Sequence, residues 1–287
     1  MDKLGRLLAR AAAPALLIVW LIACGGSPTG PTASVAGEGP ATLRVVTWNL
    51  QHGYTTGRRH ANQEQIAFLA GLKPDVVALQ ELAEWDNDMP TIYRQGLESL
   101  TGKRWMWRYE ADLPTASASR RDGNVLGTPL PIAGEDVLRL DDPSSPGDNN
   151  RNRSVIRFRV SLAGSAVDVA TTHLDHLDAG NRRSQVDRMQ AWLGRGTVRR
   201  IVAGDFNAEP EDAGTWSAWR GEYADAWLST ANPQRGAPGF TMPRRSTTGR
   251  PGRVDYQWFR GLEPSRVALV ETDLSDHHAV VVDYSIK

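Results

Sequence analysis

The chain has 287 residues, of which 40% are hydrophobic and 23% are charged, an ordinary globular composition. Its 33 Lys and Arg residues balance 33 Asp and Glu residues, so no global basic field indicates nucleic-acid binding. The single cysteine, Cys24, excludes an intrachain disulfide, and the length suffices for a large core in one big domain or two small ones.

The N-terminal segment has the pattern of a signal peptide rather than of a folded element. Three cations in the first ten residues precede an apolar stretch, residues 11–23, that is too short for a comfortable membrane span. The sequence Leu21-Ile22-Ala23-Cys24 resembles the lipobox of bacterial lipoproteins, in which the cysteine is lipidated and becomes the mature N-terminus. A plain secretory signal with an accidental cysteine is the alternative. Lipidation is favoured because the single thiol of the chain stands where this chemistry needs it.

Three segments are expected along the chain. Residues 1–23 are the signal peptide, residues 24–41 a flexible Gly/Pro/Ser/Thr-rich linker, and residues 42–287 one folded domain. A lipid on Cys24 would place this domain in the bacterial cell envelope, at the outer membrane or the periplasmic face. Without the three cations and one anion of residues 1–23, the charge balance is 30 against 32, a net charge of −2. This argues weakly against tight nonspecific binding of duplex DNA, which needs many cation–phosphate contacts.

Apolar, β-branched runs predict strands along this domain, and apolar residues at helical spacing predict helices. The expected strands are 43–48, 75–79, 105–109, 137–140, 154–162, 166–172, 200–203, 253–259, 266–271 and 279–286. The expected helices are 62–72, 91–100 and 182–193. The polar, Gly/Pro-rich segments 114–122, 141–152 and 233–252 are predicted to be irregular loops. The irregular alternation favours a mixed sheet, or two sheets with outer helices, in one domain.

Several of these hydrophobic strands carry polar residues at one rim, where the loops of sheet proteins converge and ligands gather. The residues are Asn49, Glu81, His173, Asp205, Asn207, Asp255, Asp276 and His277. Their carboxylate and amide oxygens suit Mg²⁺, Mn²⁺ or Ca²⁺ rather than zinc. The histidines can donate to phosphate oxygens or move protons, and a carboxylate can orient a histidine. Hydrolysis of a phosphate ester needs these parts.

The motifs TWN, LQE, THLDH, GDFNAEP, VDYQW and SDHH occur in this order between about Leu43 and Ile286. Together they resemble the endonuclease/exonuclease/phosphatase superfamily of metal-dependent phosphoesterases, which includes deoxyribonucleases, abasic-site endonucleases and neutral sphingomyelinases. The resemblance implies an α/β fold, a four-layer α/β/β/α sandwich of two packed mixed sheets flanked by helices. It also implies that residues 42–287 are a catalytic domain that hydrolyses a phosphodiester or phosphomonoester with metal-activated water.

The resemblance assigns the metal to three of the rim residues. Glu81 is implied to be the main metal carboxylate, with Asn49 beside it. Asp276 is implied to bind the metal or a water on the metal. The implied cofactor is Mg²⁺, with Mn²⁺ as the alternative.

The resemblance assigns the chemistry to the other five. Asp205 is implied to position or deprotonate the attacking water, and Asn207 to donate to the phosphate in the transition state. His277 is implied to contact the phosphate while paired with Asp255, and His173 to be a second phosphate-side imidazole.

Two further residues are candidates for substrate binding. Arg153, in NRNRSVIRF, matches an arginine that the family often carries, and a structural salt bridge is its alternative role. Asn124, in DGNVLGTP, is the weaker assignment, because Gly127-Thr128 replaces the usual Ser-Arg of the family motif. His278 has no predicted catalytic role, and His52 and His60 are interpreted as ordinary polar positions.

Two other functions stay open. THLDH shares its H-x-D-H spacing with half of the metallo-β-lactamase zinc motif, which would make His176 a ligand, but Thr171 stands where that motif needs a histidine. A lipoprotein that binds phosphate-bearing ligands without turnover is the second alternative, although binding alone would not need every polar group. The expected partner is a phosphate-ester substrate (nucleic acid, phospholipid headgroup, or sugar or inositol phosphate), and the expected state is a monomer.

Overall fold

The computed structural model describes residues 40–85, 88–112, 121–140, 153–194, 196–217, 219–245 and 248–287. The predicted signal peptide, Cys24 and almost all of the linker lie outside these ranges, as does the predicted loop 141–152. Within the described ranges, no helix is both long and apolar enough to cross a membrane.

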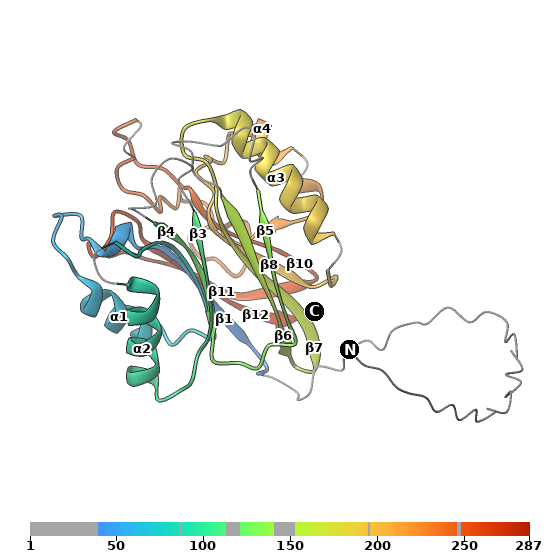
Figure 1. The fold of residues 1–287 in the computed structure, drawn as a ribbon. Coiled ribbons are helices and arrows are strands. Elements are labelled where there is room, and N and C mark those ends of the chain that lie inside the picture. Colours follow the sequence, from blue (N-terminus) through green and yellow to red (C-terminus); the bar gives the residue numbers. More distant parts are fainter. Residues whose placement is uncertain are drawn as a thin grey trace, which may run out of the picture. The chain divides into compact units, whose positions relative to one another are not determined.

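The first sheet has six strands in the order β11-β12-β1-β2-β4-β3. Their bounds are β1 Leu43–Asn49, β2 Val76–Ala83, β3 Met106–Asp112, β4 Asp122–Thr128, β11 Leu262–Val270 and β12 Ala279–Ile286. The β1–β2 pair is parallel and the other pairs are antiparallel, so the sheet is mixed. The helices α1 (Asn62–Gly71) and α2 (Met89–Thr101) pack on its outer face (Figure 1).

The second sheet also has six strands, in the order β5-β6-β7-β8-β10-β9. Their bounds are β5 Gly134–Arg139, β6 Ser154–Leu162, β7 Ser165–His173, β8 Arg200–Asp205, β9 Ala224–Asp225 and β10 Asp255–Arg260. The helices α3 (Ala179–Leu193) and α4 (Ala213–Trp216) pack on its outer face. Three 3₁₀ turns complete the described elements: η1 (Gln51–Gly53), η3 (Trp219–Gly221) and η4 (Ala226–Leu228).

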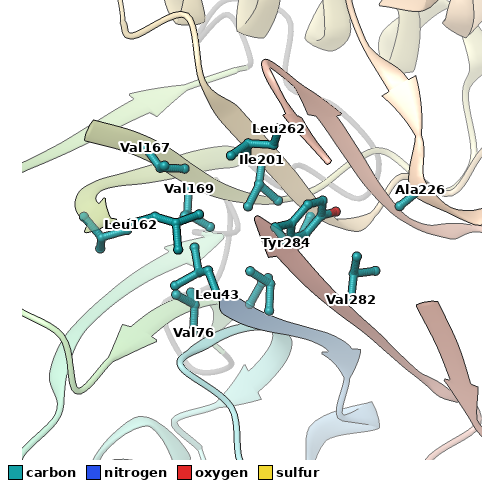
Figure 2. Close-up of a cluster of buried hydrophobic side chains, with 14 of the residues drawn as sticks. Leu43, Val76, Leu162, Val167, Val169, Ile201, Ala226, Leu262, Val282 and Tyr284 are labelled. Carbon is teal, nitrogen blue, oxygen red and sulfur yellow. The ribbon is translucent and has the colours of Figure 1, made fainter. Parts of the chain in front are cut away.

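Strands that are buried on both faces hold the layers together. In β1, Leu43 and Val45 point into the apolar cluster between the sheets, whereas Val46 and Trp48 point into the cluster beneath α1 and α2. This follows from the two-residue period of a strand. Figure 2 shows residues of the first sheet, such as Val76 and Val282, facing residues of the second. The two mixed sheets with helices on both outer faces confirm the predicted α/β/β/α sandwich.

The fold differs most from the sequence prediction at β4, which was not expected to be a strand. Its sequence DGNVLGT contains two glycines, which weaken strand propensity. A Cβ at Gly123 would lie 2.2 Å from the Glu110 carbonyl oxygen, and one at Gly127 would lie 2.4 Å from the Trp107 ring. The glycines are therefore needed for the close approach of β4 to β3. Most of the predicted loop 114–122 lies outside the described residues, and its last residue, Asp122, is the first residue of β4 instead.

Two buried glutamines connect the sheets close to their polar rim. Gln80 Nε2, from β2, donates to Thr171 Oγ1 of β7 at 3.1 Å. Gln257 Nε2, from β10, donates to the carbonyl oxygens of Val45 and Val280 in the first sheet, at 3.0 and 2.9 Å. Because a buried polar group is costly unless it is hydrogen-bonded, these contacts favour one relative placement of the two sheets.

Gly204 in β8 provides a first testable prediction. Its φ is 152°, and a Cβ there would lie 2.0 Å from the Thr172 carbonyl oxygen. We expect Gly204→Ala to lower the free energy of unfolding by about 2–4 kcal/mol, from overpacking and an unfavourable backbone conformation. Urea unfolding measures this change. Gly221→Ala is the control, because no atom lies within 4 Å of its added Cβ. Equal effects of the two substitutions would contradict the steric argument.

Candidate active site

Three strands of the second sheet bring their polar ends to one level. β7 and β8 are parallel, with His173 opposite Asp205, and β10 is antiparallel to β8, with Asp255 opposite Asp205. All three residues are almost completely buried. His173 Nε2 lies 3.5 Å from Asp205 Oδ2. The pairing of the strands therefore assembles residues that are far apart in the sequence.

The first sheet contributes Asn49 and Glu81 at the same end. A β-bulge interrupts the pairing of β2 with β4 between Leu79 and Leu82. Glu81 lies in this bulge with a φ of 59°, a left-handed conformation that is uncommon for a non-glycine residue. Asn49 Nδ2 donates to Glu81 Oε1 at 3.2 Å and to Asp205 Oδ2 at 3.1 Å, so one amide links the carboxylates of both sheets.

The loop before β12 places His277 against this cluster. Ser275 Oγ donates to the Asn49 carbonyl oxygen at 2.7 Å and accepts from the His277 N–H at 3.2 Å. Trp48 Nε1 donates to the His277 carbonyl oxygen at 2.9 Å. His277 Nδ1 lies 2.8 Å from Asp255 Oδ2, and its Nε2 lies 3.8 Å from Asp205 Oδ2. The predicted pair of His277 and Asp255 is thus in hydrogen-bond contact.

The charges of this buried cluster shift the pKa values of its members. Burial lowers the pKa of His277, but the charge and hydrogen bond of Asp255 and the charge of Asp205 outweigh it, so the pKa lies well above its usual value. Burial, together with the charge of Asp255, raises the pKa of Asp205 to about 7, although the charge of His277 opposes this shift. The cluster therefore favours the protonated form of His277 and disfavours ionisation of Asp205.

The pKa values of the two remaining carboxylates, Glu81 and Asp276, shift in opposite directions. Burial raises the pKa of Glu81, but the charges of His52 and His277 and the hydrogen bond from Asn49 outweigh it, so the pKa is lowered overall. Burial, with the charge of Glu81, raises the pKa of Asp276 despite the charge of His277. Glu81 is thus held as a carboxylate, and 21% of its side-chain surface remains exposed.

The carboxylate oxygens of this cluster fit a hard divalent cation. Among the described residues, Asp205, Asp255 and His277 offer ligand atoms that all lie within 4.8 Å of one another. Glu81 is bonded to the same Asn49 amide as Asp205, and Asp276 Oδ1 lies 3.5 Å from Ser275 Oγ, so both can offer further oxygen donors beside this cluster. Asn49 turns its amide nitrogen toward the carboxylates, and its Oδ1 accepts from the Gln51 N–H at 3.0 Å. The amide therefore orients Glu81, and the assignment of Asn49, Glu81 and Asp276 as metal ligands stays a prediction.

Asn207 lies just beyond β8 with a φ of 51°. Its N–H donates to Asp205 Oδ1 at 2.9 Å, and its Nδ2 donates to the Leu174 carbonyl oxygen at 3.1 Å. One oxygen of Asp205 is therefore fixed by this turn, and the other faces Asn49 and the histidines.

The two predicted substrate-binding residues are both buried. Arg153 NH1 is 2.9 Å from Asp112 Oδ2, and both side chains are 1% exposed, which is the geometry of the structural salt bridge considered as its alternative role. Asn124 is fully buried on β4, and its Nδ2 donates to Ser154 Oγ at 3.5 Å. A substrate-binding role for either residue stays a prediction.

The pair of Arg153 and Asp112 allows a stability prediction. Removal of one member leaves the other as a buried charge without this partner, which costs about 3–5 kcal/mol. We expect Arg153→Met and Asp112→Asn each to lower the free energy of unfolding by about this amount in urea titrations. The double substitution should cost clearly less than the sum. Additive losses would show that the two side chains do not act as a pair.

The structure adds two residues that the sequence analysis missed, His52 and Asp122. His52 Nδ1 lies 3.4 Å from Glu81 Oε2, and its Nε2 lies 3.0 Å from Asp122 Oδ2. The sequence alone predicts an ordinary polar position for His52 and a loop for Asp122. Nothing in the sequence links these residues, because the contact spans 70 positions.

The geometry around Thr171 and Asp175 does not favour the zinc alternative. Thr171 Oγ1 accepts a hydrogen bond from Gln80, and Thr171 is fully buried. Asp175 accepts hydrogen bonds from the N–H groups of Leu177 and Asp178, both at 2.8 Å, so its carboxylate stabilises the turn that leads into α3.

The comparisons with known proteins agree with the fold. A structure of an endonuclease/exonuclease/phosphatase from Beutenbergia cavernae matches with a TM-score of 0.67 at 23% identity, over 86% of this chain and 72% of that one. D. rerio TDP2 complexed with a single-strand DNA product gives a TM-score of 0.64 at 17% identity, over 85% and 99% of the chains. The human Nocturnin catalytic domain with bound sulfate gives 0.62 at 19% identity, over 86% and 96%.

Among curated proteins, none matches the chain. The sequence profile of the endonuclease/exonuclease/phosphatase family matches residues 46–277, which is most of the chain and includes every predicted residue of the site except Cys24. The chain therefore belongs to the endonuclease/exonuclease/phosphatase family of phosphate-ester hydrolases.

Proposed function

We propose that the chain is a Mg²⁺- or Mn²⁺-dependent phosphoesterase of the bacterial envelope, tethered to the membrane by a lipid on Cys24. One observation carries the catalytic part of this proposal. Asn49 Nδ2 bonds carboxylates from both sheets, Glu81 and Asp205, next to the pair of His277 and Asp255. This arrangement combines oxygen donors for a cation with imidazoles and a carboxylate for proton transfer.

The cation would bind on the side of the first sheet. A divalent cation held by Glu81, with Asn49 and Asp276 beside it, would polarise the phosphoryl group and stabilise the leaving oxygen. The lowered pKa of Glu81 keeps this side chain negatively charged. Its partial exposure leaves it reachable from solvent.

The residues of the second sheet supply the proton transfer and the contacts to phosphate. Asp205, with Oδ1 fixed by the Asn207 N–H, would hold the attacking water with its other oxygen and accept the proton. With its Nδ1 hydrogen-bonded to Asp255, His277 would contact the phosphate through Nε2. His173 is close to the same Asp205 oxygen and would donate to a second phosphate oxygen.

The substrate class is a phosphate ester. A nucleic acid is supported by the DNA product bound to D. rerio TDP2, and the sulfate bound to human Nocturnin has the size and charge of a phosphate group. Phospholipid headgroups and sugar or inositol phosphates are the other predicted substrates.

The test uses purified protein with Mg²⁺, Mn²⁺, Zn²⁺ or EDTA and a panel of substrates. The panel contains duplex and single-stranded DNA, RNA, sphingomyelin, inositol phosphates and bis-p-nitrophenyl phosphate. We expect cleavage that requires Mg²⁺ or Mn²⁺ and is abolished by EDTA. Activity with zinc alone would favour the zinc alternative. Binding of panel members without cleavage under any metal would favour the non-catalytic lipoprotein.

The membrane tether is tested separately by mass spectrometry of the mature protein. We expect an N-terminal Cys24 that carries the mass of a diacylglyceryl group and an additional acyl chain. An unmodified N-terminus downstream of Cys24 would rule out the lipid anchor without affecting the proposed catalysis.

A further inference from the structure

The imidazole of His52 lies between two carboxylates at the edge of the proposed metal site. Its Nδ1 is 3.4 Å from Glu81 Oε2, and its Nε2 is 3.0 Å from Asp122 Oδ2. We call these three residues the His52 bridge. Asp122 is almost completely buried, whereas His52 and Glu81 keep about a quarter and a fifth of their side-chain surface exposed. The bridge therefore runs from the interior of the first sheet to the solvent-accessible rim.

The backbone that carries His52 is held in an unfavourable conformation. Gln51, His52 and Gly53 have successive positive φ values of 47°, 54° and 83°. The Gln51 N–H donates to Asn49 Oδ1 at 3.0 Å, so the turn is attached to the end of β1. The φ of 83° at Gly53 strains any residue with a side chain, and a Cβ there would also lie 2.0 Å from Asn62 Oδ1, so this position favours glycine. Such conformations persist where the surroundings fix them, and they cluster at functional sites.

The inner end of the bridge is anchored in the sheet. Asp122 is the first residue of β4 and pairs with Ala83 of β2 and with Asp112 of β3. The Trp85 ring lies 4.9 Å from the His52 ring, measured between centroids. The imidazole is thus held by a fixed carboxylate on one side and by an aromatic ring on another.

The outer end of the bridge meets Glu81, whose two carboxylate oxygens have different neighbours. Oε1 accepts from Asn49 Nδ2 at 3.2 Å, and Oε2 faces His52 Nδ1 at 3.4 Å. Glu81 lies in the β-bulge of β2, where strand pairing does not fix its position. Asn49 and His52 together therefore set the orientation of this carboxylate.

We propose that His52 is a positioning residue, which Asp122 holds so that it orients the Glu81 carboxylate for binding of the divalent cation. This inference rests on the proposed function, in which Glu81 is a ligand of that cation. Groups that orient a metal ligand typically change metal affinity or activity by about 10- to 100-fold when they are replaced. A histidine that merely added positive charge near the cation would have the opposite effect, because its removal would tighten binding.

The experiment measures Mn²⁺ binding to the purified full chain by isothermal titration calorimetry, with manganese electron paramagnetic resonance as a second readout. We expect His52→Gln to raise the Mn²⁺ Kd by about 10- to 100-fold and Asp122→Asn to raise it in the same direction. At saturating Mn²⁺, the substrate KM should stay unchanged. His60→Gln is the matched control. His60 belongs to the same segment as His52, but its ring packs against the Tyr54 ring, at 4.1 Å between centroids. Its Mn²⁺ Kd should equal that of the unsubstituted protein.

The possible outcomes are distinct. An unchanged or lower Mn²⁺ Kd in folded His52→Gln overturns the inference, and so does wild-type Mn²⁺ affinity in Glu81→Gln. If His52→Gln does not fold, Asp122→Asn decides by the same measurement. A raised Kd in a protein that cleaves no phosphate ester supports the His52 bridge while the proposed function fails.

Discussion

We expect Glu81→Gln to lower kcat by about 10³-fold and to leave the fold intact. The amide keeps the size of the side chain, and its oxygen can still accept from Asn49 Nδ2, which bonds Glu81 at 3.2 Å. The substitution removes the negative charge that would hold the cation. A bound metal contributes several kcal/mol of charge stabilisation in the transition state, and each 1.4 kcal/mol corresponds to about tenfold in rate. The loss of about three such tenfold factors gives the expected 10³-fold decrease in kcat.

The control for this substitution is Glu84→Gln. Glu84 lies just beyond the end of β2 and pairs with Arg121 at 2.6 Å, a partly exposed ion pair that contributes at most about 1 kcal/mol. We expect its kcat to be unchanged. Steady-state kinetics on the cleaved panel substrate, with thermal unfolding to confirm the fold, measure both variants. Wild-type turnover in Glu81→Gln would refute the assignment of Glu81 as the metal carboxylate.

Much of the fold could be predicted because hydrophobic periodicity reports burial directly. Strand β6 was predicted with its observed bounds, Ser154–Leu162, and α1, α2 and α3 were placed within a few residues, whereas the short helix α4 was not predicted. Strand β4 was missed because Gly123 and Gly127 carry no side chains that could show a pattern. Strands β2 and β8 were predicted too short, since polar residues at their ends, such as Glu81 and Asp205, do not resemble strand residues.

The candidate site could be predicted only as a set of rim residues. Hydrophobic patterns indicate where a strand ends, but they do not show which strands lie side by side. The hydrogen bond from Asn49 to Asp205 spans 156 positions and joins two different sheets. The contact of His52 with Asp122 depends on a left-handed turn and on an unpredicted strand, so sequence reasoning placed neither residue at the site.

The paired arrangement of His277 and Asp255 gives the second large effect. We expect His277→Ala to lower kcat by about 10²- to 10⁴-fold, the usual contribution of a positioned acid or base. Asp255→Asn should lower kcat less, because the imidazole remains but its Nδ1 loses the carboxylate at 2.8 Å that fixes its orientation. His278→Ala is the neighbouring control, since the His278 N–H contact to the Thr241 carbonyl oxygen survives the substitution. Its kcat should stay within a few-fold of wild type.

His277 and Asp255 are both buried, so an effect of their substitution on folding must be separated from an effect on catalysis. Removal of the His277 imidazole leaves the buried Asp255 carboxylate without this partner, which costs about 3–5 kcal/mol of stability. His277→Gln, which keeps a polar group at this position, serves as the second variant if His277→Ala unfolds.

The decisive measurement is the double substitution of His277 and Asp255. If Asp255 acts only by orienting His277, then Asp255→Asn has no further effect on kcat once His277 is alanine, because residues that act as a unit are not additive. The kcat of the double variant should then equal that of His277→Ala. A further loss equal to the single effect of Asp255→Asn would show that Asp255 acts on the reaction independently. Asp255 would then act on the attacking water most directly through Asp205, because the two residues are paired in the sheet.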